Sequence, residues 1–224
     1  MNDILDLLGG SQDASLASGA RPRTLVTFPP YETAVTLFAC FENNVEHMCQ
    51  VLDLPSVRSF MKSFYTRIGQ GESVPPGQAA LLLALFALSV YFYQPIGMAK
   101  PVAGRHETTG LSKYWSRGAL DVLEHSRRNT SGTLEDVQAL ILMSYVTYHL
   151  DGFAARYRNL LATAISMARD LGLHQLDSDD CSLTNLMNDS PDIRTLIDQE
   201  VKRRVYWHLV SADWYDEHLP FRAS

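Results

Sequence analysis

Histidine, cysteine and acidic side chains are the residues of this 224-residue chain that could carry out catalysis or bind a metal. The three cysteines are too few and too scattered for a disulfide framework or a structural zinc site; they are Cys40, Cys49 and Cys181. No C-x-x-C or H-x-x-x-H pair occurs, and five dispersed histidines lack helical pairing: His106, His125, His149, His174 and His208. The sequence therefore predicts no metal ligand, cofactor-binding residue or catalytic residue.

An acidic cluster lies in the polar stretch from 175 to 192, at Asp177, Asp179 and Asp180. A calcium loop would need glycine at its sixth position and a closing glutamate, but Ser182 stands there and no such glutamate follows. The D-D-x-x-D spacing of a diphosphate–magnesium cluster is also absent. A solvated loop between helices is the favoured interpretation. With no G-x-S-x-G and no phosphate-binding glycine loop, an all-helical enzyme is the least favoured function.

Two helices joined by a tight turn, over 133–174, are the strongest structural prediction. In the first helix, apolar residues recur every three or four positions: Leu134, Val137, Ile141, Tyr145 and Tyr148. In the second helix they form one stripe: Phe153, Tyr157, Leu160, Leu161, Ala164, Ile165, Ala168 and Leu171. Thr133 and Asp136 match a capping box, and Gly152 and Gly172 match helix ends. The two helices must therefore pack against each other.

Five further helices are expected over 31–52, 56–68, 78–93, 111–126 and 193–217. The fold class is thus all-α, an irregular bundle of about seven helices centred on the 133–174 hairpin. Residues 1–29 are rich in Gly, Ser, Ala and Pro and are expected to form a mobile leader, 30–217 the domain, and 218–224 a tail. The apolar run over 79–93 is shorter than a bilayer span, so a buried core helix is predicted.

The charge balance argues against direct DNA binding by this chain. Its 25 acidic residues exceed its 19 lysines and arginines, which gives a net charge of −6. A module that grips DNA by itself normally presents a basic face, because neutralising phosphates supplies most of its affinity. The run Lys202–Arg204 could be a nuclear localisation signal, but surface ion pairs with Glu200 and neighbouring acids are favoured.

Three motifs occur in a fixed order. They are Gln138-Ala139-Leu140; Ala164 followed by Met167-Ala168 and Leu171-Gly172-Leu173-His174; and Glu200, Arg203, Arg204, Trp207 and Asp213. In this order they resemble the middle homology region of fungal zinc-cluster transcription factors. The resemblance covers about Pro30 to Glu217, the first half of that region, without the six-cysteine zinc cluster.

This resemblance implies a nuclear protein whose helical domain modulates transcription while a separate segment holds DNA. Zinc is expected only in an absent N-terminal cluster, so this chain needs no cofactor. Other regulator chains or coregulators are the expected partners, DNA is contacted only through a missing segment, and no membrane is involved. The small-molecule effector is unknown. A truncated paralogue that acts as a protein-interaction or effector-binding module is the alternative.

The motif residues are interpreted as scaffold: Gln138, Gly152, Met167, Ala168, Gly172, His174, Glu200, Arg203, Arg204, Trp207 and Asp213. Tyr145, Tyr148 and Trp207 are candidates for facing a ligand, and the alternative is that all three are core aromatics.

Overall fold

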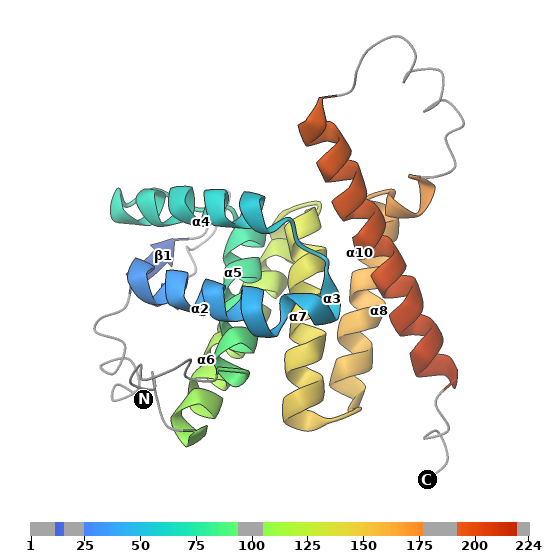
Figure 1. The fold of residues 1–224 in the computed structure, drawn as a ribbon, viewed down its shortest axis with the longest axis horizontal. Coiled ribbons are helices and arrows are strands. Elements are labelled where there is room, and N and C mark those ends of the chain that lie inside the picture. The colour runs from blue at the N-terminus through green and yellow to red at the C-terminus, as the bar shows by residue number, and fades with distance from the viewer. Residues whose placement is uncertain (1–11, 16–24, 94–104, 177–191, 219–224) are drawn as a thin grey trace.

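The computed structural model describes residues 12–15, 25–93, 105–176 and 192–218, and almost all of their regular structure is helical (Figure 1). These ranges contain eight α-helices and one 3-10 turn: α2 (Tyr31–Asn44), α3 (Glu46–Cys49), α4 (Leu54–Gly69), α5 (Pro76–Tyr91), α6 (Arg105–Asn129), α7 (Leu134–Asp151), α8 (Ala155–Asp170), η1 (Leu173–Gln175) and α10 (Ile193–His218). The predicted all-α fold is confirmed. The acidic cluster at 177–180 lies outside the described residues.

The segment predicted as one helix over 31–52 is two helices and a turn. Val45 ends α2 with φ −124° and ψ −40°, and Gln50 ends α3 in the left-handed conformation, with φ 51°. Gln50 is the only non-glycine residue with positive φ in the described ranges. A glutamine rarely adopts this conformation, so the apolar periodicity gave no sign of it. The prediction of a continuous helix was wrong at these two positions.

α5 and α7 together occupy the centre of the bundle. Every residue from Ala79 to Val90 is 0% exposed, because α2, α6 and α7 surround α5. α7 in turn packs on α8, and α10 crosses the outer side of α8 (Figure 1). The predicted 133–174 hairpin is present, but its second helix lies toward the outside and α5 is the most enclosed element. No helix in the described ranges combines the length and apolar character needed to cross a bilayer.

Two short strands precede the first described helix. β1 (Gln12–Ser15) and β2 (Leu25–Phe28) pair antiparallel, with Gln12 opposite Phe28. Phe28 is fully buried, and its ring meets the edge of Phe64 at 5.0 Å between centroids. The end of the segment expected to be a mobile leader is therefore packed into the core, because an apolar residue at every second position of LVTF suits a strand with one buried face.

The predicted capping box at the start of α7 is confirmed. Thr133 N–H donates to Asp136 Oδ2 at 2.9 Å, and Asp136 N–H donates to Thr133 Oγ1 at 3.3 Å. Ser126, near the end of α6, donates to the same carboxylate oxygen at 3.0 Å. Gly152, with φ 73°, ends α7 and lets the chain reverse into α8. These contacts fix the relative positions of α6, α7 and α8.

Candidate functional site

Four side chains from α7 and α10 converge on the turn that follows α3. Three of them donate hydrogen bonds to backbone carbonyls of this turn. Gln138 Nε2 donates to Val51 O at 2.7 Å, Tyr145 Oη to Met48 O at 3.2 Å, and Arg204 Nη1 to Gln50 O at 3.1 Å. His208 bonds the backbone of Cys49. Four successive residues, 48 to 51, are thus held by side chains distant in sequence. We call Gln138, Tyr145, Arg204 and His208 the carbonyl clamp.

Burial shifts the pKa of two of the four clamp residues, Tyr145 and His208. Burial raises the pKa of Tyr145 to about 12, so its hydroxyl stays protonated and can donate. Burial lowers the pKa of His208, and the bond to the Cys49 backbone opposes that shift. The two rings lie 5.8 Å apart between centroids. Near neutral pH the clamp therefore includes a protonated Tyr145 hydroxyl and a neutral His208 ring.

Glu46 lies beside the clamp in an unfavourable setting for a carboxylate. Burial raises its pKa to about 7; the positive charge of Arg204 lowers it and the negative charge of Glu42 raises it. Its Oε2 atom is buried and has no hydrogen-bond partner among the described residues. Glu46 is thus the acid next to the clamp whose charge depends on pH near neutrality.

The remaining motif residues take structural or surface positions. Ala168 is a fully buried residue of α8. Gly172, with φ 73°, follows the end of this helix. Glu200 accepts a hydrogen bond from Arg203 at 2.8 Å, and Lys202 pairs with Asp198, so the interpretation of this basic run as surface ion pairs is confirmed. His174 and Asp213 are exposed.

The aromatic residues predicted to face a ligand are Tyr145, Tyr148 and Trp207, and each takes a different position in the bundle. Tyr145 belongs to the clamp, and Tyr148 is 39% exposed at the end of α7, 4.7 Å from the Phe153 ring centroid. Neither tyrosine lines the groove between α6 and α8 or the cavity between α4, α7 and α10 that are described below. Tyr148 and Trp207 are both exposed, Trp207 at 55%, so the alternative that all three are core aromatics does not hold for these two residues. A ligand-facing role for the tyrosines stays a prediction.

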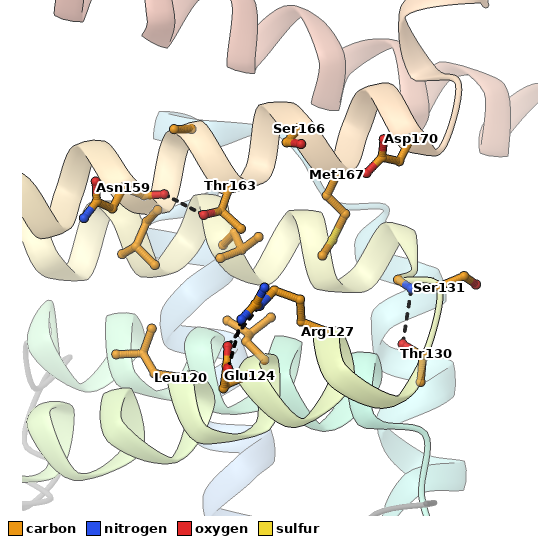
Figure 2. A pocket seen from close by; sticks show the side chains of 15 residues that line it. Leu120, Glu124, Arg127, Thr130, Ser131, Asn159, Thr163, Ser166, Met167 and Asp170 are labelled. Atoms are coloured by element: carbon orange, nitrogen blue, oxygen red, sulfur yellow. Dashed lines mark hydrogen bonds and ion pairs between the residues drawn. The ribbon is translucent and has the colours of Figure 1, made fainter. Parts of the chain in front are cut away.

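An open groove of about 850 Å³ runs between α6 and α8, with α7 beneath it (Figure 2). Its apolar lining is Leu120 and Leu123 of α6, Leu140 of α7, and Leu160 and Met167 of α8. The loop 130–132 lines the groove where α6 turns into α7. Gly132, with φ 81°, lies against Met167 there: a Cβ atom at this glycine would be 3.3 Å from the Met167 sulfur. The groove thus has an apolar floor and a defined end.

The two walls of the groove differ in their free polar groups. On α6, Arg127 donates from Nε and Nη2 to the two Glu124 oxygens at 3.0 Å each, and Arg128 also binds Glu124. These bonds hold the pKa of Glu124 at about 2. On α8, Asn159, Ser166 and Asp170 line the groove, and their side chains make no hydrogen bond within the described residues. The apolar stripe predicted for this helix does not include Asn159 or Ser166, and neither residue was predicted to line a site.

A second cavity, of about 650 Å³, lies between α4, α7 and α10. Two of its three acids are already engaged: Asp53 accepts the Ser56 N–H as the α4 cap, and Asp198 pairs with Lys202. The third, Glu135, makes no ion pair within the described residues. Cys40 and Cys49 are buried in the core, and the described residues gather no three histidine, cysteine or acidic side chains that could hold a metal. These residues do not fit a zinc cluster. The α6–α8 groove has the larger volume of these two cavities and is therefore the better candidate for a binding site.

An all-helical scaffold whose motif residues hold turns and helix ends beside an open groove is typical of a binding or regulatory domain. The family model described as fungal specific transcription factor domain matches residues 43–216, and the chain belongs to this family.

Three relatives are named as transcription factors. The probable transcription factor lepB of Aspergillus flavus is 39% identical over 190 residues, which cover 84% of this chain and 33% of that protein. Transcription factor TAS2 of Pyricularia oryzae is 30% identical over 206 residues, 89% of this chain and 25% of that protein. The agnestins biosynthesis cluster transcription factor AgnL11 of Paecilomyces divaricatus is 32% identical over 192 residues, 85% of this chain and 27% of that protein.

The chain thus spans between a quarter and a third of the length of these curated relatives. No protein of known structure matches it.

Proposed function

We propose that this chain is a regulatory domain that modulates transcription in the nucleus and does not itself hold DNA. The observation that carries the proposal is the family match over residues 43–216. The net charge of −6 supports the second half of it, since DNA-gripping modules need a basic face. The domain would act on a DNA-binding segment elsewhere in the regulator, by binding an effector or a partner, and would catalyse no reaction.

The position of α7 suggests how such a domain could respond to an effector. Leu140 of the groove and Gln138 of the carbonyl clamp are two residues apart on this helix. A ligand in the groove would favour one position of α7, and the clamp would carry that preference to the α3 turn and to α10. A ligand can shift such an equilibrium only as far as it binds one packing better than the other.

A fusion experiment tests the regulatory role. The chain is placed between a heterologous DNA-binding domain and an activation domain, and a reporter gene is read at matched fusion levels. A fusion with an unrelated helical spacer of the same length is the control. We expect severalfold lower output from the fusion with this chain, because its bundle restrains the activation domain. Equal output from the two fusions would contradict the proposal.

The alternative role, as an interaction module, is favoured by the outer face of α10. Trp207, Val210 and Trp214 are 55%, 37% and 56% exposed, and their spacing places them on one face of the helix. Co-expression with a relative from the same family tests this role. A complex that survives size-exclusion chromatography and is lost in Trp207→Ala supports it, whereas recovery of free monomer alone counts against it.

A further inference from the structure

We propose that the groove between α6 and α8 binds a small elongated organic molecule with an apolar ring body and a protonated amine, with the amine at Asp170. This proposal specifies the effector of the proposed regulatory domain and, as a statement about regulation, rests on that function. The binding itself can be tested on the chain alone.

The size and the floor of the groove suit an apolar small molecule. Its volume of about 850 Å³ falls in the range of roughly 300–1,000 Å³ that is usual for small-molecule sites. The α8 wall runs from Asn159 to Asp170, a span of eleven residue-to-residue steps, or about 16 Å at the helical rise. The five leucine and methionine side chains of the floor give a ring system an apolar surface along this length.

The charge requirement comes from the two walls. Glu124 is neutralised by two arginines, and Arg127 uses two of its nitrogens for that contact, so the α6 wall offers no free carboxylate. Asp170 makes no ion pair within the described part of the chain. It is the last residue of α8, where the helix dipole is negative and an acidic side chain is unfavourable. Asp170 is exposed and therefore solvated, and a cation bound beside it would offset the unfavourable interaction with the helix dipole.

The polar groups around Asp170 can orient an amine. Ser131 and Ser166 line the same groove, and both are exposed hydroxyl-bearing residues. Figure 2 places Asp170 and Ser166 on α8 and Ser131 on the loop after α6, with the Met167 side chain projecting from α8 toward α7. Ser166 and Asp170 are four residues apart on α8 and so share one face of the helix. An ammonium group has three donors, so this carboxylate and the Ser166 hydroxyl can both accept from it while the ring lies on the leucines.

A matched pair of probes tests the proposal. The probes 2-(1-naphthyl)ethylamine and 1-naphthylacetate share the ring but carry opposite charges at neutral pH. Binding to the chain is followed by chemical shifts of 13C-methyl-labelled methionines, with Met167→Leu assigning the groove signal. We expect the amine to shift the Met167 signal, to leave buried Met61 unchanged, and to bind about fivefold more tightly than the carboxylate. Asp170→Asn should remove that preference.

Two tryptophan substitutions serve as blocked and control variants. Ser166→Trp fills the groove and should abolish binding of both probes, whereas Ser211→Trp, at an exposed position of α10, should change neither affinity. If Ser166→Trp does not fold by circular dichroism, Ala162→Trp replaces it. Equal affinities for the two probes, or binding that survives the blocked variant, would overturn the proposal. Because no transcription is read, such a failure leaves the regulatory role to the fusion experiment.

Discussion

At the scale of single residues, a motif side chain can be required for what it holds in place. Gln138 is nearly buried, and its amide donates to Val51 O, a carbonyl 87 residues away in sequence. Tyr145 and Arg204 likewise donate to the carbonyls of Met48 and Gln50, and Gln50 has the left-handed backbone conformation. The turn after α3 could not make these bonds with its own helix, so α7 and α10 must supply the donors.

Gln138→Leu tests this role, because it keeps the side-chain bulk and removes the donor. Val51 O would then be buried without a partner, which costs about 1–3 kcal/mol of unfolding free energy. Urea denaturation followed by circular dichroism measures the loss. Gln70→Leu makes the same chemical change at an exposed position and should stay within about 0.5 kcal/mol of the unchanged chain. A similar loss of unfolding free energy in both variants would contradict a stabilising role for the Gln138–Val51 hydrogen bond.

Glu46 predicts a pH dependence of stability. Burial raises its pKa to about 7, so between its ordinary value and pH 7 the folded chain binds a proton that the unfolded chain has released. The stability contributed by this group is therefore present at low pH and is lost as pH rises through about 7. Glu46→Gln removes the charge, so we expect its stability advantage over the unchanged chain to widen from pH 5 to pH 8.

Urea midpoints at the two pH values measure this difference. Glu72→Gln, at an exposed position, is the control and should show a constant offset. If the difference in urea midpoint between Glu46→Gln and the unchanged chain is the same at both pH values, burial does not destabilise the ionised carboxylate.

At the scale of elements, the close approach of α5 and α7 depends on Gly77. A Cβ atom at this position would collide with Thr133 Oγ1, the acceptor of the α7 capping box. Gly77→Ala should therefore destabilise the chain by about 1–3 kcal/mol, as overpacking does elsewhere. Gly69→Ala is the control, because a Cβ atom there meets nothing within 4 Å and alanine is the better helix former. Thermal unfolding of both variants tests this, and a neutral Gly77→Ala would contradict it.

Local sequence patterns predicted the helices better than the tertiary contacts between them. The apolar stripes of α7 and α8 and the capping box of α7 were visible because each depends on residues within a few positions of one another. The break at Val45 and Gln50 was not, since tertiary hydrogen bonds select that backbone conformation. The Arg204–Gln50 bond joins residues 154 positions apart. The groove was equally invisible, because it depends on α6 and α8 both packing on α7.

At the scale of the whole molecule, the described residues form a packed bundle around α5 whose specific polar contacts hold its helices together. The matched family region, 43–216, includes the carbonyl clamp, both helices of the hairpin and the walls of the groove. A regulatory domain built this way should act only when it is folded. Loss of the core should therefore remove its effect on transcription, while a surface change of the same kind should not.

The most direct test compares two alanine-to-aspartate variants in the reporter fusion, with output divided by fusion protein level. Ala84 is fully buried in α5, where an unpaired carboxylate would disrupt the core, whereas Ala155 is exposed at the start of α8, where an acid is tolerated. We expect Ala84→Asp to raise the output to that of the helical spacer, and Ala155→Asp to keep the low output of the unchanged chain. Equal outputs from Ala84→Asp and the unchanged chain would contradict a regulatory role for the folded bundle.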